Sequence, residues 1–371
     1  MSLSNIPSLE DFSRRFSSAI PHSPSVLYAS VILLRETKSY AIFTTEGGQQ
    51  QDTERTQAGL TQGQPIDRLV MFKRKQVAPE RRTGKALLRQ YGIFPYAIVS
   101  PPKKPIELIY GTEAIEAREQ QVAEHNKGAQ AASKMGFSRA DDCYLTAGLC
   151  THCPDCLLYG YAAIEGEGAR KARVMTDSCF SVRPYPLIQK DIKFNVIDEQ
   201  TQTSGTITEY DYTIPEVFLP SVVTTVDLTL DEFVYVLGNV LRTTRYGKES
   251  SRQGFIRNHV LALAFSDVEL FANLELTQAF YDAFTSDFAN EKDEKVAKID
   301  LANQSLARQD FEKRAPKIIG DLTRHLYGRL QLVQGEALKV VLSEIEKLYQ
   351  NEERLRGFLR GLNDQSASFV V

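Results

Sequence analysis

The sequence predicts a mixed α+β fold, on three observations. Residues 26–34 and 40–45 are β-branched and aromatic runs, which are typical of two paired strands in a central sheet. Thr229 and Glu232 have the spacing of a capping box, and apolar residues three and four positions apart then continue to Leu241, which predicts a helix. The charged region 291–363 carries apolar stripes at helical spacing, so helices are expected to follow the strand-rich part.

Composition limits the function. A chain of 371 residues forms several domains, or one domain with sizeable insertions. With 42% hydrophobic and 25% charged residues, it has enough apolar side chains for a soluble core. A net charge of -3 argues against a general polyanion binder, so any nucleic-acid site is expected to be a local basic stripe. No apolar run is long enough to span a bilayer and no signal peptide is recognisable, which predicts a cytoplasmic protein without a membrane partner.

The densest positive run follows a stretch with few apolar residues. Residues 46–65 consist mainly of Gly, Gln and Thr, which predicts a mobile loop or the edge of an insertion. Only Glu80 opposes the basic run, which favours phosphate contacts over a solvated face. Residues 83–86 superficially resemble a phosphate-binding loop, but they lack its first glycine and its final Ser/Thr, so a nucleotidase is rejected. The cations of the run are Lys73, Arg74, Lys75, Arg81, Arg82, Lys85 and Arg89.

A cysteine cluster carries the sharpest chemical signal. Its four thiols, Cys143, Cys150, Cys153 and Cys156, lie within a short stretch, and thiolates at such gaps bind one soft cation. We therefore predict a structural zinc site, with His152 as an alternative ligand. An iron–sulfur cluster is a second interpretation of the same spacing. The fifth cysteine, Cys179, lies in a predicted strand and is expected to be a buried small hydrophobe.

Two further stretches predict nucleic-acid contacts. Residues 160–173 form a glycine-bearing loop that ends in three cations, Arg170, Lys171 and Arg173. Residues 191–226 alternate as a long β-hairpin around Gly205 and supply the rings of Tyr210, Tyr212 and Phe218.

The loop after the capped helix has the residue types of a phosphate site. Glycine allows close approach of the backbone to a ligand, and guanidinium groups match phosphate oxygens. Glu249 is the one acidic residue in this loop, so a polyanion site is favoured over an ordinary solvated turn. The candidate residues are Arg242, Arg245, Tyr246, Gly247, Lys248, Ser250, Ser251 and Arg252, and a buried strand is expected over 260–265.

The remaining segments are assigned by the same signals. A surface helix is expected over 112–135, a strand over 174–182 and a helix around 274–284. The apolar stripes of the C-terminal region are expected to be packing surfaces; they consist of Leu338, Val341, Leu342, Ile345 and Leu348, and of Leu355, Phe358, Leu359 and Leu362. The five histidines are scattered and none lies in a known catalytic motif.

Taken together in chain order, these motifs resemble those of the repeat-associated CRISPR proteins of the RAMP superfamily. Specifically, they resemble the backbone subunit of the type I-D surveillance complex (Cascade). The resemblance covers roughly residues 26–284, and its most specific parts are the Tyr-Gly loop and the cysteine insertion. It rests on Cys156-Leu-Leu-Tyr159-Gly160, on Ile214-Pro215-Glu216-Val217-Phe218, on Arg245-Tyr246-Gly247 and on Arg252-x-Gly254-x-x-Arg257-Asn258.

The resemblance implies a core like an RNA-recognition motif (ferredoxin-like) with insertion subdomains. In that family several copies wrap one guide RNA (crRNA), and each thumb hairpin displaces a base. The implied partners are the crRNA, a target DNA strand, copies of the chain itself and other Cascade subunits. The implied parts are core (1–48), lid or helical insertion (49–130), zinc knuckle (131–160), core (161–190), thumb (191–226), core with the RNA-binding loop (227–290) and C-terminal helical region (291–371).

Related subunits of RNA-targeting complexes cleave target RNA with an aspartate in a loop after the first strands. Asp52 and Asp67 lie in the comparable loop, but their neighbours do not mark that activity. We therefore expect a non-catalytic scaffold. The alternatives are a zinc- or iron–sulfur-containing nuclease or redox enzyme, and a protein-interaction module.

Overall fold

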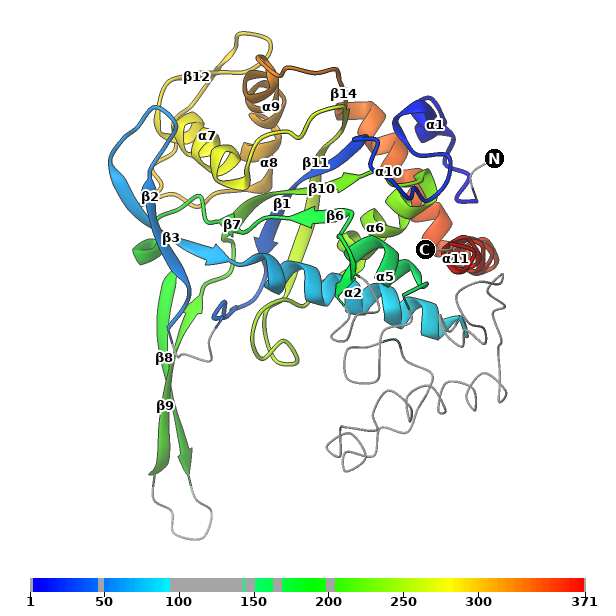
Figure 1. The fold of residues 1–371 in the computed structure, drawn as a ribbon. Coiled ribbons are helices and arrows are strands. Elements are labelled where there is room, and N and C mark those ends of the chain that lie inside the picture. Colours follow the sequence, from blue (N-terminus) through cyan, green and yellow to red (C-terminus); the bar gives the residue numbers. More distant parts are fainter. Residues whose placement is uncertain are drawn as a thin grey trace.

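The structure is a computed structural model that describes residues 3–45, 50–93, 143, 151–162, 169–197 and 204–369, with the backbone alone for 162, 192–197 and 204–210. It contains both helices and strands, as expected for an α+β protein (Figure 1). The predicted surface helix over 112–135 and Cys150 lie outside the described residues. No helix in the described part is long and apolar enough to cross a membrane.

A five-stranded sheet within the described residues forms the centre, in the order β14-β11-β1-β10-β6. All of its neighbours are antiparallel, with Val31 of β1 opposite Val223 of β10 and Leu263 of β11. The strands are β1 (Tyr28–Thr37), β6 (Val174–Thr176), β10 (Phe218–Val226), β11 (Ile256–Ser266) and β14 (Leu330–Val333).

The predicted pairing of residues 26–34 with 40–45 is wrong. Both edges of β1 are already hydrogen-bonded, to β10 and to β11, so no edge is left for a third strand. Residues 40–45 instead run past the end of β1 and form one bridge, between Ala41 and Thr213.

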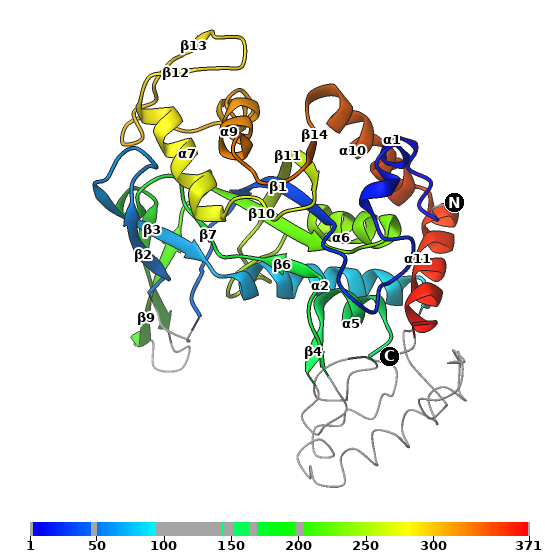
Figure 2. The ribbon, with the colours of Figure 1, turned by 45° about the horizontal axis from the view of Figure 1, so that its top comes forward.

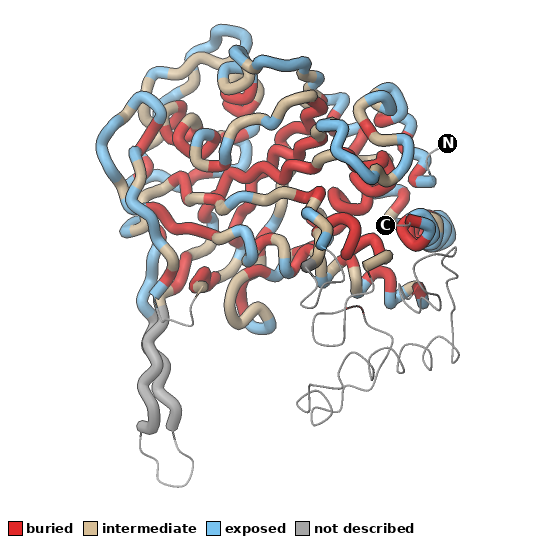
Figure 3. Tube along the Cα trace, in the orientation of Figure 1, coloured by how far each residue is buried: buried red, intermediate tan, exposed pale blue. Residues whose placement is uncertain are grey.

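Helices cover both faces of this sheet (Figure 2). Alternate residues of β1 point to opposite sides, as strand geometry requires. Val31 and Leu33 belong to the core under α6, α10 and α11, whereas Ile32 and Leu34 belong to the core under α7 and α9. Figure 3 shows buried, red segments gathered in the middle of the body, with exposed, pale blue segments around its outside. The helices are α1 (Pro7–Glu10), α2 (Lys73–Gln90), α6 (Leu230–Arg242), α7 (Asn273–Thr285), α9 (Ala315–Thr323), α10 (Gly335–Gln350) and α11 (Glu352–Ala367).

Helix α6 begins where the sequence predicts. Thr229 Oγ1 accepts from the backbone N–H of Glu232 at 3.2 Å, and Glu232 Oε2 accepts from the N–H of Thr229 at 2.9 Å. This reciprocal pair satisfies two N–H groups that a helix start otherwise leaves unpaired. The capping box is confirmed, as are α7 and the burial of both C-terminal stripes, in which Leu342 alone is partly exposed.

Three smaller assignments need correction. The predicted loop over 46–65 contains β2 (Thr53–Gln57), which pairs with β3 (Pro65–Met71). The predicted strand over 174–182 is split, because β6 joins the central sheet whereas β7 (Cys179–Phe180) pairs with β3. The region after 291 is not purely helical, since β14 returns to the edge of the central sheet.

The predicted hairpin is present but shorter than expected. β8 (Gln189–Ile197) and β9 (Ser204–Thr213) pair and project from the body (Figure 1). Residues 218–226, assigned to the same hairpin, are β10 in the middle of the central sheet. The other short elements are the 3-10 turns η1 (Ser13–Arg15) and η2 (Tyr185–Leu187), helices α5 (Pro154–Tyr159) and α8 (Arg308–Glu312), and the strands β4 (Tyr161–Ala162), β5 (Ala169–Arg170), β12 (Phe288–Ala289) and β13 (Lys295–Val296).

Candidate nucleic-acid interface

Residues 40–45, here called the seam, join three elements that are distant in sequence. The N–H groups of Lys248 and Gly254, in the α6–β11 loop (residues 243–255), donate to Ile42 O at 2.9 Å and Tyr40 O at 2.7 Å. Arg74, in the first turn of α2, donates from Nη2 to Thr45 O at 2.8 Å. Ala41 pairs with Thr213 at the base of the β8–β9 hairpin. The seam therefore brings the start of α2, the loop and the hairpin base together.

Two glycines allow the loop to lie against the seam. Gly247 and Gly254 have φ values of +84° and +74°, a region that side chains disfavour. A Cβ on Gly247 would lie 2.4 Å from Ile42 O, and one on Gly254 would lie 2.0 Å from Tyr246 O. The loop also closes on itself, because Tyr246 N–H donates to Gly254 O at 2.9 Å.

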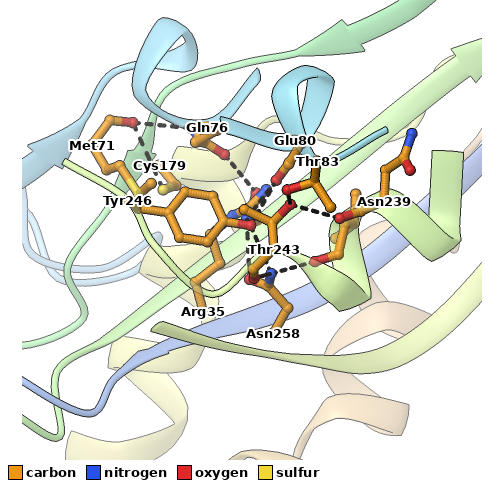
Figure 4. Close-up of polar contacts among 12 residues, drawn as sticks. Arg35, Met71, Gln76, Glu80, Thr83, Cys179, Asn239, Thr243, Tyr246 and Asn258 are labelled. Carbon is orange, nitrogen blue, oxygen red and sulfur yellow. Dashed lines mark hydrogen bonds and ion pairs between the residues drawn. The ribbon is translucent and has the colours of Figure 1, made fainter. Parts of the chain in front are cut away.

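Tyr246 points inward, as Figure 4 shows. Its side chain is fully buried, and its hydroxyl donates to Glu80 Oε1 of α2 at 3.1 Å. The hydroxyl oxygen of Tyr246 also accepts hydrogen bonds from Asn258 Nδ2 at 2.8 Å and from Arg35 Nη1 at 3.2 Å. Its burial raises the pKa of Tyr246 well above the ordinary value, so the hydroxyl stays protonated. The ring of Tyr246 is therefore not available for stacking on a base in this conformation, and the RNA contact predicted for this residue stays a prediction.

Arg35 and Glu80 form a buried ion pair beneath the loop. Arg35 Nη1 lies 2.9 Å from Glu80 Oε1, and the arginine is completely buried. Burial alone lowers the pKa of the guanidinium, but the Glu80 carboxylate more than offsets it, so the Arg35 pKa is raised. The pair is ionic.

Cations gather around the seam. Lys73, Arg74 and Arg252 are exposed, and Lys75 and Lys248 are half-buried. The pKa of Lys75 is lowered, first by burial and then by the positive charge of Arg74 and Lys248, while Asp52 partly opposes this. These three cations are therefore close enough to repel one another, as expected where a polyanion is bound. Ser251 is exposed and Ser250 half-buried in the same loop.

Sequence reasoning missed several residues of this region. Phe255 is half-exposed, and the guanidinium carbons of Arg245 and Arg257 lie 5.3 and 5.6 Å from the centre of its ring. Lys190, at the hairpin base, lies 5.9 Å from the ring centre of Tyr40. The sequence offered one signal for these residues: Phe255 and Arg257 are two positions apart at the start of a strand, which places both side chains on one face.

Several predicted contact residues lie elsewhere. Arg81 Nη2 and Lys85 Nζ pair with Asp155 Oδ2 at 2.7 and 3.3 Å. Arg173 is buried and pairs with Glu232, and Arg170 lies 4.3 Å from the ring centre of Phe369. The guanidinium of Arg242 lies 5.6 Å from the ring centre of Tyr349.

Burial excludes two of the predicted rings from a contact surface. Phe218 packs against Phe311, with ring centres 4.8 Å apart, and Tyr212 is buried at the hairpin base. The side chain of Tyr210 lies outside the described residues, and Arg82 and Lys171 are exposed.

The described cysteines of the cluster converge. Cys143 Sγ lies 3.3 Å from Cys156 Sγ and 3.8 Å from Cys153 Sγ, and all three thiols are buried. A tetrahedral thiolate site with bonds of about 2.3 Å places its sulfurs about 3.8 Å apart, so this arrangement fits a soft cation. His152 is directed elsewhere, with Nδ1 3.1 Å from Phe369 O. Cys150 lies outside the described residues.

Comparison with known proteins identifies the family. The model of the Csc2 CRISPR family matches residues 15–106 and 111–359. The chain belongs to the Csc2 family. The crystal structure of Csc2 from Thermofilum pendens is 15% identical, covers 97% of this chain and 96% of its own, and has a TM-score of 0.53, which shows a common fold. Csc2-like architecture therefore extends over nearly the whole chain.

More distant matches were also found. A chain of a CRISPR RNA-guided surveillance complex, pre-nicking, is 12% identical over 80% of this chain and 88% of its own, with a TM-score of 0.43. No curated protein sequence matches.

Proposed function

We propose that this Csc2-family protein is a guide-RNA-binding backbone subunit of a type I-D Cascade in CRISPR antiviral defence. Copies of the chain polymerise along the crRNA and present it to a target DNA strand, beside the other Cascade subunits. Family membership supports the CRISPR role. The basic surface around the seam supports the RNA role, and it is the observation that carries the proposal.

The arrangement of the core supports a scaffold of the RNA-recognition-motif type. β1, α2, β6, β10, α6 and β11 follow in a β-α-β-β-α-β order, and the four strands lie side by side as β11-β1-β10-β6. Such modules commonly stack bases on the open face of the sheet. Here described helices cover both faces, so the RNA is held at the rim, where the loop, the start of α2 and the hairpin base meet.

The residue types at the rim fit recognition without sequence preference. Lysine and arginine side chains contact phosphates whatever the base, and a backbone subunit must accept every guide. A local basic surface on a chain with a net charge of -3 leaves other surfaces for contacts with protein. The Phe255 ring between Arg245 and Arg257 offers a face for stacking.

The cysteine cluster completes the proposal as a zinc knuckle. Cys143, Cys153 and Cys156 fit three ligand positions, and Cys150 is proposed as the fourth. Zinc at a site with four protein ligands supplies a cross-link and no open position for a substrate. The knuckle is therefore a support for the fold.

We further propose that the protein is not an enzyme. Asp52 Oδ1 accepts from Thr45 Oγ1 at 3.0 Å, and Asp67 is exposed on β3 opposite Arg55. We expect target RNA bound to the crRNA-loaded protein to stay intact with Mg²⁺ or Mn²⁺. Cleavage by the wild type that disappears in Asp52→Ala or Asp67→Ala would overturn this part.

The proposal is tested by RNA titration at two salt concentrations. Fluorescence anisotropy with a random single-stranded RNA of guide length is measured at 50 and 200 mM salt, and the mixtures are imaged. We expect steeply salt-dependent binding, and several evenly spaced copies on each RNA. Lys248→Ala with Arg252→Ala should weaken binding about tenfold or more at low salt and reduce the salt slope by about 1.

A matched control removes two exposed cations at the other end of the molecule. Lys292→Ala with Lys295→Ala changes the net charge equally, in and beside the β12–β13 hairpin, far from β8 and β9 (Figure 1). It should leave affinity and slope near those of the wild type. Absence of binding by the wild type at low salt, or equal loss in both double variants, contradicts the proposed surface.

A further inference from the structure

Four polar side chains meet beneath the α6–β11 loop, namely those of Arg35 (β1), Glu80 (α2), Tyr246 (the loop) and Asn258 (β11), and we call them the anchor (Figure 4). We propose that Tyr246 and Glu80 are positioning residues for the RNA site. They fix the loop on α2 so that Lys248 stands beside Arg74 and Lys75. This inference rests on the proposed function, but it concerns residues that the RNA itself cannot reach.

The anchor connects the loop and α2, two of the elements that present cations at the seam. Glu80 lies on the same helix as Arg74 and Lys75, one to two turns further on. Tyr246 stands two residues before Lys248. One hydrogen bond, from the Tyr246 hydroxyl to Glu80 Oε1 at 3.1 Å, thus links the cations of the loop to those of α2. Because a helix is stiff over two turns, that bond sets the relative position of the two groups.

A second contact repeats the connection one turn later. Thr243 Oγ1, at the end of α6, donates to Thr83 Oγ1 of α2 at 2.8 Å. Glu80 and Thr83 are three residues apart, so both project from the same face of α2. Asn258 Nδ2 meanwhile donates to Val240 O at 2.7 Å and Thr243 O at 3.2 Å, which satisfies carbonyls at the C-terminus of α6. The loop therefore starts from a fixed point.

A gain in stability does not by itself explain the polar side chains of the anchor. Arg35 is completely buried, and its Nε and Nη2 make no hydrogen bond to the described residues. Buried donors without partners destabilise a fold, and apolar side chains of similar volume often fill such a space as well or better. Polar networks have a different advantage, because their directional bonds select one arrangement of the elements they join. This favours a geometric role.

The guanidinium of Arg35 also constrains the ring of Tyr246. Its central carbon lies 5.3 Å from the ring centre, and its Nη1 reaches the hydroxyl at 3.2 Å. Arg35 therefore contacts both the face of the Tyr246 ring and its hydroxyl group. Loss of the hydroxyl should leave the ring buried but free to shift, and Lys248 should shift with it.

The test removes one oxygen atom. Tyr246→Phe and the control Tyr235→Phe each delete the hydroxyl of a tyrosine that is at most 1% exposed. The Tyr235 hydroxyl lies against α2 near Gly84, and among the described residues no hydrogen bond joins it to the loop. The full-length chain is titrated with single-stranded RNA of guide length at 50 and 200 mM salt, and each Tm is measured.

We expect Tyr246→Phe to weaken RNA binding about tenfold at low salt and to flatten the salt dependence, since fewer phosphates are contacted at once. Tyr235→Phe should keep both the wild-type affinity and the wild-type slope at a comparable Tm. Wild-type binding by Tyr246→Phe overturns the inference. Equal weakening in both variants, in proportion to their loss of Tm, assigns the anchor to stability alone and also overturns it.

Thr83→Val provides a second route should Tyr246→Phe not fold. It deletes the acceptor for Thr243 while keeping the shape of the side chain, and we expect several-fold weaker binding with a flatter slope. An unchanged slope with unchanged affinity contradicts the inference. If the wild type itself fails to bind RNA, the proposed function fails, so the two failures are distinguishable.

Discussion

Arg81 of α2 donates two parallel hydrogen bonds to Asp155, which lies among the clustered cysteines. Its Nε and Nη2 lie 2.9 and 2.7 Å from the two carboxylate oxygens, and Asp155 is 2% exposed. Lys85 joins them at 3.3 Å, and the guanidinium of Arg81 also lies over the ring of Tyr159. Two cations that the sequence assigned to RNA therefore hold the knuckle against α2.

Asp155→Asn should destabilise the protein by about 2 kcal/mol. Breaking a fully buried pair costs about 3–5 kcal/mol, and the partial exposure of Arg81 and Lys85 reduces this figure. Urea unfolding followed by circular dichroism measures the change. Asp321→Asn, which breaks exposed pairs on α9, should cost less than about 1 kcal/mol. Equal effects of the two substitutions would contradict a structural role of Asp155.

Metal removal tests the knuckle. Zinc bound by the cysteine cluster, as proposed, would stabilise the folded state, because the unfolded chain has no preformed site. A chelator, or Cys153→Ser, should remove about one equivalent of zinc and lower the Tm by about 5 °C or more. Elemental analysis and a thermal melt measure both quantities. A brown protein that contains iron would favour the iron–sulfur interpretation instead.

Gly254→Ala should disrupt the loop. The new methyl group would meet Tyr246 O at 2.0 Å, and φ is already in the left-handed region, so we expect a loss of about 1–3 kcal/mol. RNA affinity should fall as well. Gly320→Ala is the control, because a Cβ at this position inside α9 would meet nothing within 4 Å outside the helix's own backbone, and alanine favours a helix by about 0.5–1 kcal/mol. Thermal melts of both variants should move in opposite directions.

Burial raises the pKa of the Cys179 thiol to about 12, whereas Arg35 partly opposes the shift. The thiol of the unfolded chain ionises near 9, so the folded state binds more protons between these values, and the Cys179 contribution to stability falls as pH rises from 9 to 12. We expect Cys179 to resist iodoacetamide at pH 9 and to react after denaturation, as measured by mass spectrometry. Rapid alkylation of the native protein contradicts its burial.

The parts of the fold that the sequence predicted depend on local signals. The capping box at Thr229 and the apolar stripes of α10 and α11 need only neighbours within a few residues. The placement of Phe218 was wrong because a β-branched strand of the central sheet and a strand of a projecting hairpin have the same residue pattern. Membership of a sheet depends on strand partners that are distant in sequence. Pro220 of β10, for example, pairs with Leu34 of β1, which lies almost two hundred residues earlier in the chain.

The candidate site was only partly predictable for a similar reason. The basic residues of α2 look equivalent in sequence, yet Arg74 of the first turn contacts the seam, whereas Arg81 and Lys85 of the later turns contact Asp155. Arg74 and Arg81 are seven residues apart and therefore lie on nearly the same face of α2, about 10 Å apart along its axis, so only the tertiary structure shows what each of them meets. Tyr246 was predicted as an RNA contact because it lies among the cations and glycines of the loop, and its inward direction depends on the buried pair beneath it.

The short strand β14 has a consequence for any attempt to trim the protein. It covers residues 263–266 of β11, on the side that β1 leaves open. A chain that ends before Leu330 would expose those backbone N–H and C=O groups as a flat, apolar edge, which is a template for pairing with another molecule. We expect such a truncated chain to elute as large aggregates in size-exclusion chromatography. The last 42 residues thus shield the edge of β11, although the proposed RNA surface lies elsewhere.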